Sequence, residues 1–448
     1  METRLETDNI KGLVFRLALP SMAAQFVSVL YSIVDRMYIG HIPEIGGAAL
    51  AGVGVCGPIV TMISAFSFLV GIGGGPLVSI RLGQKREKDA ERILSTCFYM
   101  LIAIGLVVML AVFLIKEPLL RWFGASEAVF PYADEYFSIY LAGTLFALLS
   151  TGMNQFIICQ GYARTAMFSV ILGAVLNIIL DPVFIFVLHM NTKGAALATI
   201  LSQFVSCLFV LHFLFSSRSQ LRIHWLKKMD HKIVKNVCKL GLSPFLIIAF
   251  DNIMLIALNA VITKYGKGGE GDLLLTCNTI LQSFMLMVTM PLGGITGGTQ
   301  TILGYNYGAR RKDKIIEAQK YILLLSLSFT VLMFLFAQTS AQFFIRIFTK
   351  DPIYMQKTAE LVRVYTMAIP LLTFNYVIID GFTGMGLYQY ALPLSAWRKV
   401  VYFGGVFLIP PLFGIGQVFW AEALSDVLGP LVSIAVYLTL GRKMLNRL

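Results

Sequence analysis

The chain has 448 residues, of which 57% are hydrophobic and only 13% are charged, with a formal net charge of +12. Soluble domains carry about 25% charged residues, and apolar runs of about twenty residues recur here from end to end, so the composition excludes a soluble protein and predicts a polytopic membrane protein. The positive charge is typical of basic cytoplasmic loops, and we expect no binding of nucleic acid.

The apolar runs predict an all-α membrane protein. They are long and do not alternate, which favours helices over a closed barrel. The N-terminal stretch lacks a short apolar core followed by a small-residue cleavage site, so we expect the first helix to be retained. Twelve transmembrane helices are predicted, at 13–39, 48–72, 93–115, 134–159, 167–188, 194–215, 240–263, 273–302, 316–345, 358–386, 391–413 and 416–440.

Basic residues gather in alternate connections between these helices, whereas the other connections are poorer in Lys and Arg. Because cytoplasmic loops carry the excess of basic residues, this bias predicts that both termini are cytoplasmic, in the inner or cell membrane. The basic segments are 81–92, 217–239, 309–314, 397–399 and the tail 441–448.

The two halves of the chain echo each other at a common offset of half the chain length. Pro20 corresponds to Pro244, Asp35 corresponds to Asn259, and the glycine run GIGGG (71–75) corresponds to GITGG (294–298). The common offset predicts two pseudo-symmetric six-helix bundles around a central cavity, related by an axis along the membrane normal. The expected domains are an N-terminal lobe at 1–215, a cytoplasmic linker at 216–239 and a C-terminal lobe at 240–448. The glycine runs indicate close helix packing or bending.

The six cysteines are scattered in or beside apolar runs and form no C-x-x-C pair, and the five histidines are equally dispersed. We therefore expect neither a disulfide framework nor a metal site beyond a possible Na⁺ site.

The fifth predicted helix contains the sequence LNIILDPVFIF, which places a carboxylate in an apolar run. Asn177 and Asp181 are four residues apart and share a helix face, and Pro182 deprives an upstream carbonyl of its helical partner. Counted at about 1.5 Å per residue, Asp35, Asp181 and Thr199 all fall in the outer half of the membrane. A carboxylate in lipid is costly, so two at matched depth predict a shared cation or proton site.

Other acidic residues at membrane depth are weaker candidates. Asp251 lies near the middle of the seventh helix without an obvious partner, and Asp380 lies toward the cytoplasmic end of the tenth, where it could reach water. Glu422 and Asp426 share one face of the twelfth helix, as a helix-packing or water-facing pair or as functional groups.

Several motifs together resemble the MATE (multidrug and toxic compound extrusion) family of transporters. They are LALP (17–20), VDRMYIG (34–40), GIGGGPLVSIRLGQK (71–85), QGYARTAMFSVILGAVLNIILDPVFIF (160–186), GAALAT (194–199) and GITGGTQTILGYNYGARR (294–311). The resemblance implies two six-helix bundles that form a V and a cation site in the N-terminal lobe. Its motif positions match Asp35, Asn177, Asp181 and Thr199, and less closely Tyr136. In the C-terminal lobe, Asp251 and Asn259 are candidate substrate-binding residues, and a second cation site is doubtful.

The predicted function is a cation-coupled antiporter that exports organic, cationic or amphipathic compounds by alternating access. The coupling ion is Na⁺ or H⁺, no cofactor is expected, and the partners are the bilayer and small molecules, with a monomer as the expected state. One alternative is a lipid-linked saccharide flippase of the same superfamily, for which Arg36 and Arg164 would be the cationic side chains of interest. A membrane-embedded enzyme would need a nucleophile–base pair or a metal cluster, and the sequence shows neither.

Overall fold

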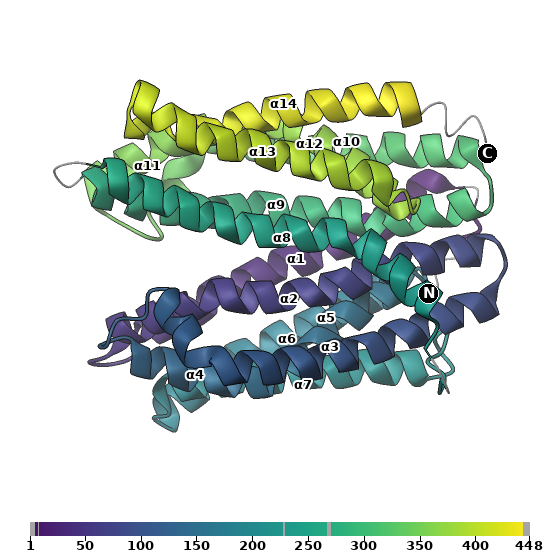
Figure 1. Ribbon diagram of the computed structural model, residues 1–448, viewed down its shortest axis with the longest axis horizontal. Coiled ribbons are helices and arrows are strands. Elements are labelled where there is room, and N and C mark those ends of the chain that lie inside the picture. Colours follow the sequence, from purple (N-terminus) through teal and green to yellow (C-terminus); the bar gives the residue numbers. More distant parts are fainter. Residues whose placement is uncertain (1–4, 8, 227–228, 267–269, 442–448) are drawn as a thin grey trace. The chain divides into compact units, whose positions relative to one another are not determined.

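The computed structural model describes residues 5–7, 9–226, 229–266 and 270–441, so the predicted basic tail beyond Gly441 lies outside the described residues. Within these ranges all regular secondary structure is helical, as predicted (Figure 1). The α-helices are α1 (Ile10–Gly40), α2 (Gly46–Gly83), α3 (Glu87–Trp122), α4 (Phe130–Ala142), α5 (Thr144–Ile158), α6 (Ala163–Pro182), α7 (Asn191–Phe215), α8 (His231–Tyr265), α9 (Glu270–Gly308), α10 (Lys312–Ile345), α11 (Pro352–Tyr365), α12 (Ile369–Gly384), α13 (Tyr388–Phe413) and α14 (Trp420–Val436). Short π or 3₁₀ segments are η1 (Val183–Val187), η2 (Ile415–Gln417) and η3 (Tyr437–Gly441).

The long helices account for the predicted membrane spans. Among the described residues, ten helices are long and apolar enough to cross a membrane, and two bent helix pairs bring the total to as many as twelve. Each predicted span falls on one of these helices or pairs. The chain is therefore an all-helical, multi-pass membrane protein.

Two of the spans are broken, which the apolar runs did not predict. Helices α4 and α5 meet at 56°, and α11 and α12 meet at 49°. The first break is at Gly143, a poor helix former, where a Cβ would lie only 2.4 Å from a side-chain carbon of Ile200. The second lies just before Pro370, which stands in the first turn of α12; a proline has no N–H to give to the preceding turn, so a new helix begins there.

The positions of the helices repeat along the chain. Helix α2 begins at Gly46, and α9 begins at Glu270, half a chain length later. Nearly the same spacing separates the start of α3 from that of α10, and the start of α6 from that of α13. The two broken spans are the fourth and the tenth, so each half carries its break in the same place.

The helices form two compact units whose boundaries differ from the midpoint of the chain. The first unit contains Ala23–Ile248, and the second contains Ala249 onward together with the start of α1 up to Met22. Helices α1 and α8 therefore each contribute to both units, and both change unit within a few residues of a proline, Pro20 or Pro244. The lobe boundaries 1–215 and 240–448 stay a prediction.

Each glycine run packs against the part of α1 or α8 that belongs to the same unit. In the first unit, a Cβ on Gly73 of α2 would lie 2.4 Å from the carbonyl oxygen of Val237, and one on Gly241 would lie 1.7 Å from the carbonyl oxygen of Leu69. Helices α2 and α8 therefore cross with their backbones in close approach.

The second unit repeats this contact between α9 and the first half of α1. A Cβ on Gly294 would lie 2.7 Å from the carbonyl oxygen of Ser21, and one on Gly298 would lie 2.3 Å from the hydroxyl oxygen of the same serine. The interpretation of both glycine runs as helix-packing sites is confirmed.

Candidate cation site

Four of the five predicted cation-site residues are linked by contacts in the first unit, between α1, α6 and α7. The side-chain nitrogen of Asn177 donates to Asp181 Oδ1 at 3.5 Å and to Thr199 Oγ1 at 3.4 Å. Asp181 is fully buried and Asn177 is 2% exposed. The carboxyl groups of Asp35 and Asp181 interact directly, although the two residues lie on helices α1 and α6.

Three oxygen atoms in this cluster are buried and have no hydrogen-bond partner. They are Asp35 Oδ1, Asn177 Oδ1 and Asp181 Oδ2. Buried polar atoms in native proteins are nearly always paired, and two ionised carboxylates have only acceptor atoms to offer each other. The cluster is therefore rich in acceptors and short of donors, which is the chemistry that suits a proton or a hard cation.

The backbone around Pro182 holds this geometry. The α-helix ends at Pro182 and continues as the π-helical turn η1, and such turns are frequent at functional sites. Helix α7 packs tightly on η1 because Gly194 has no side chain: a Cβ there would lie 2.8 Å from the carbonyl carbon of Phe184. This close approach brings the face of α7 that carries Thr199 to Asn177.

Tyr136 and Tyr31 lie near the carboxyl groups and Tyr140 lies beside them, and sequence reasoning found only Tyr136. Tyr136 is 7% exposed, interacts with Asp35 and stacks on Tyr140 with ring centroids 6.3 Å apart. Tyr31 lies close to both Asp35 and Asp181. Tyr31 precedes Asp35 by four residues and Tyr140 follows Tyr136 by four, so helical spacing was the signal that could have identified both.

The site differs from a transition-metal centre. Among the described residues, no group of three or more His, Cys, Asp or Glu side chains could hold a metal ion. Only two side chains of those types meet here, and the other oxygens come from a carboxamide and hydroxyl groups. Oxygen ligands of this kind suit hard, weakly held cations.

The equivalent position in the second unit has no carboxylate. When the starts of α6 and α13 are matched, Asn177 corresponds to Tyr402 and Asp181 to Val406, while Asn259 echoes Asp35. Asn259 Oδ1 accepts from Asn278 at 3.0 Å, so this candidate substrate residue takes part in an amide network. The arrangement of the first unit is therefore not repeated in the second.

Three carboxylates of the second unit are instead paired with basic residues. Arg398 lies 2.5 Å from Glu422 Oε1 and 2.8 Å from Asp426 Oδ1, and its side chain is 11% exposed. Lys399 forms an ion pair with Asp251. Asp251 therefore has a partner, contrary to expectation, and Glu422 and Asp426 are a helix-packing pair rather than a water-facing one.

Two further expectations about charged residues change in the structure. The basic segment 397–399 was assigned to a loop, but it lies inside α13. Charges are tolerated within a membrane helix when they are paired, and Arg398 and Lys399 find their partners on α14 and α8. Asp380 accepts a hydrogen bond from Gln300 at 3.1 Å, so it has a protein partner and does not depend on water alone.

Comparison with known proteins agrees with this architecture. A family model described as MatE matches residues 20–183 and 246–400. The multidrug export protein MepA of Staphylococcus haemolyticus is 22% identical over 441 residues, which is 98% of this chain and 96% of that protein. MepA of Staphylococcus aureus (strain MRSA252) is 23% identical over 423 residues, covering 94% and 91% of the two chains.

Solved structures share the fold. A MOP superfamily transporter from Pyrococcus furiosus superposes with a TM-score of 0.91 at 23% identity, covering 100% of this chain and 99% of that one. An outward-facing multidrug resistance MATE family transporter gives the same TM-score, identity and coverage. The comparisons do not favour a flippase, and the matched family works without a cofactor. The family model matches more than half of the chain's length. The chain therefore belongs to the MATE family of multidrug efflux transporters, which are not enzymes.

Proposed function

We propose that the protein is an antiporter that exports organic, cationic or amphipathic compounds in exchange for Na⁺ or H⁺. The cation site is formed by Asp35, Asn177, Asp181 and Thr199, with Tyr136 beside it. The observation that carries this proposal is the set of three buried, unpaired oxygens from Asp35, Asn177 and Asp181.

Coupling requires that the ion bind one conformation more tightly than another. The ligands come from separate helices: Asp35 from α1, Asp181 from α6 and Thr199 from α7. A bound cation would hold these helices together, and its release would free two carboxylates that repel each other in a buried setting. Ion occupancy therefore biases the arrangement of the helices, and alternating access of the exported compound follows from that bias.

The orientation and setting of the transporter are part of the proposal. The excess of Lys and Arg in alternate connections supports cytoplasmic termini, and we expect the chain to act as a monomer in the cell membrane. The names of the MepA relatives, multidrug export proteins, support the substrate class.

The test uses purified protein in proteoliposomes that contain ethidium as a fluorescent organic cation. Efflux is driven by an imposed Na⁺ gradient at equal pH, or by a pH gradient without Na⁺. The wild type is expected to respond to one of the two gradients, which identifies the coupling ion. Asp35→Asn and Asp181→Asn are expected to abolish gradient-driven efflux, because each removes one ionised ligand.

Asp134→Asn is the matched control, since Asp134 lies on α4 of the same unit and is paired with Lys116 at 2.7 Å. This variant is expected to keep wild-type coupling. Retention of gradient-driven ethidium efflux in both site variants would refute the assignment of the cation site, and the absence of efflux under either gradient in the wild type would refute the proposed antiport.

A further inference from the structure

Five charged side chains of the second unit lie together among its helices, and we call them the charge cluster. They are Asp251 of α8, Arg398 and Lys399 of α13, and Glu422 and Asp426 of α14. The side chains from α13 and α14 are at most 11% exposed. The two basic residues are adjacent in the chain, so the ion pairs that they form are neighbours.

The packing of α13 on α14 makes room for Arg398. Gly429 follows Asp426 by three residues and lies on the same helix face. A Cβ on Gly429 would lie only 3.1 Å from Cβ and Cγ of Arg398. A Cβ on Gly405 would lie 2.8 Å from that of Ala421, so the two helices approach closely there as well. The aliphatic stem of the arginine therefore lies over a glycine, and its guanidinium group is directed to the two carboxylates.

The guanidinium group satisfies only part of this carboxylate pair. Nε and Nη2 of Arg398 lie 3.0 Å and 2.8 Å from one oxygen, Asp426 Oδ1, and Nη2 lies 2.5 Å from Glu422 Oε1. The second oxygen, Asp426 Oδ2, is buried without a hydrogen-bond partner. Buried polar atoms are nearly always paired in native proteins, so this oxygen indicates a place for a further positive charge.

The charge cluster is one positive charge short. Its two basic side chains contribute two positive charges and its three ionised carboxylates contribute three negative charges, which leaves a net charge of −1. An uncompensated charge among membrane helices is costly. The side chains that face the cluster do not supply the missing charge, because phenols are uncharged near neutral pH and the remaining group is itself acidic. They are Tyr365 of α11, Tyr376 and Asp380 of α12, and Tyr402 of α13.

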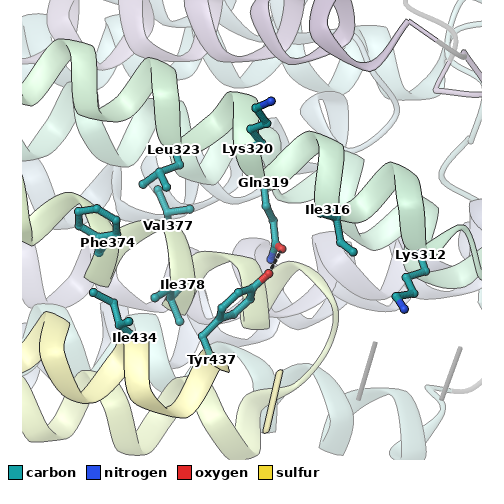
Figure 2. Close-up of a pocket in the computed structure, with 10 residues that line it drawn as sticks. All are labelled: Lys312, Ile316, Gln319, Lys320, Leu323, Phe374, Val377, Ile378, Ile434 and Tyr437. Carbon is teal, nitrogen blue, oxygen red and sulfur yellow. Dashed lines mark hydrogen bonds between the residues drawn. The ribbon is translucent and has the colours of Figure 1, made fainter. Parts of the chain in front are cut away.

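A pocket of the second unit does not compensate the cluster either. Its volume is about 620 Å³, and residues of α10, α12, α14 and η3 line it. Figure 2 shows Gln319 and Tyr437 hydrogen-bonded in its wall. None of the residues that line this pocket belongs to the charge cluster. The missing positive charge therefore has to bind at the cluster itself.

Positive charge can reach the cluster at two places. Asp426 is fully buried, so the charge that fits at its free oxygen is a proton. The side chain of Asp251 is 52% exposed, and charged groups of membrane helices avoid lipid and line water-filled space, so an organic cation can reach this carboxylate. Lys399 connects the two places, because it pairs with Asp251 and also interacts with Asp426.

We propose that the charge cluster exchanges one proton for one organic monocation. Without the compound, Lys399 pairs with Asp251 and Asp426 carries the proton. When the cationic group of the compound binds Asp251, the Lys399 ammonium group keeps its protons and turns to Asp426, whose proton leaves to water. The cluster is neutral in both states, as its buried setting demands. This inference rests on the proposed export of organic cations, and it differs from the sequence-based expectation that a second cation site is doubtful.

The test measures proton release when ethidium binds to the purified full chain in detergent without sodium. Asp35→Asn and Asp181→Asn are present throughout, so that the site in the first unit contributes no proton. Isothermal titration calorimetry in phosphate and in Tris, whose heats of ionisation differ, gives the number of protons released. About one proton per ethidium is expected near neutral pH, and ethidium affinity should rise with pH because the proton competes with the compound.

Two variants of the cluster test the charge count. Asp426→Asn leaves the other four charges balanced, so proton release should disappear and ethidium affinity should fall about tenfold or more. Adding Lys399→Gln restores the net charge of −1 and frees Asp251, while Arg398 keeps Glu422. Ethidium affinity should then recover without proton release. If Asp426 only held the fold together, removal of a second ion pair would not restore binding.

Glu360→Gln is the matched control. It removes one negative charge from the second unit outside the cluster, at a position on α11 where Glu360 pairs with Lys357 at 3.1 Å. Proton release and ethidium affinity should stay unchanged in this variant. Thermal unfolding confirms that each variant is folded.

Three results would overturn the proposal. The first is an absence of proton release, or of ethidium binding, in the Asp35/Asp181 background. The second is proton release that persists in Asp426→Asn, and the third is failure of Lys399→Gln to restore ethidium affinity in the folded double variant. Loss of gradient-driven efflux in proteoliposomes of the wild type, with proton release intact, would count against the proposed antiport and would still support this exchange.

Discussion

Replacing Gly73 by alanine tests the close crossing of α2 and α8 in the first unit. The new Cβ would lie 2.4 Å from the carbonyl oxygen of Val237 and 2.9 Å from the backbone nitrogen of Gly241. Both atoms belong to backbone and cannot rotate away. Overpacking of this kind costs about 1–3 kcal/mol, whereas alanine gains at most about 1 kcal/mol over glycine in a helix. We expect a net loss of stability of about 1–2 kcal/mol.

Gly75→Ala is the matched control, because it lies in the same glycine run and the nearest atom to its new Cβ is Cys159 Cβ at 4.0 Å. That distance is an ordinary contact, so the helix-propensity gain should dominate. Thermal unfolding in detergent, followed by intrinsic fluorescence, should place the Tm of Gly73→Ala below the wild type and that of Gly75→Ala at or above it. Shifts of the same sign and size in the two variants would refute the packing argument.

Three further predictions concern charge, ion binding and the connection between α7 and α8. Arg398→Met should destabilise the protein by about 3–5 kcal/mol in thermal unfolding, because it leaves two buried carboxylates without their basic partner. Adding Glu422→Gln with Asp426→Asn should recover most of the lost stability. If Na⁺ is the coupling ion, Na⁺-dependent thermal stabilisation should weaken as pH falls, because protons compete for the same two aspartates, and a constant effect across pH would contradict shared ligands. Leu221→Ala should cost about 2–5 kcal/mol by the same unfolding assay, since its side chain is fully buried, and no change in Tm would show that this connection contributes little.

The membrane spans were predictable because hydrophobic length is a local property of the chain. The repeat was also visible, since prolines and glycine runs recur at one offset. The bends at Gly143 and before Pro370 were not predicted, because glycine and proline are common in unbroken membrane helices as well. What distinguishes Gly143 is the approach of Ile200 from another helix, and no sequence pattern records that contact.

The cation site was partly predictable for a similar reason. A carboxylate in an apolar run is costly and therefore conspicuous, which identified Asp35 and Asp181. Tyr31 and Tyr140 were missed because a tyrosine in a membrane helix is ordinary. Arg398 and Lys399 were wrongly assigned to a loop because a basic cluster in the sequence is typical of a cytoplasmic loop. Their acidic partners lie on other helices, and the sequence alone does not show those contacts.

The exchange of helix segments between the two units has a consequence for biosynthesis. The first unit needs residues up to Ile248, so it cannot be completed when only the first half of the chain has left the ribosome. The start of α1 is among the earliest residues made, yet it must wait for α9 before it finds its packing partner. Domains usually mature in order of synthesis; here the first unit must wait for the start of α8, and the second unit takes up the start of α1 only after α9 has been made. Neither half made alone would contain every segment that its unit requires.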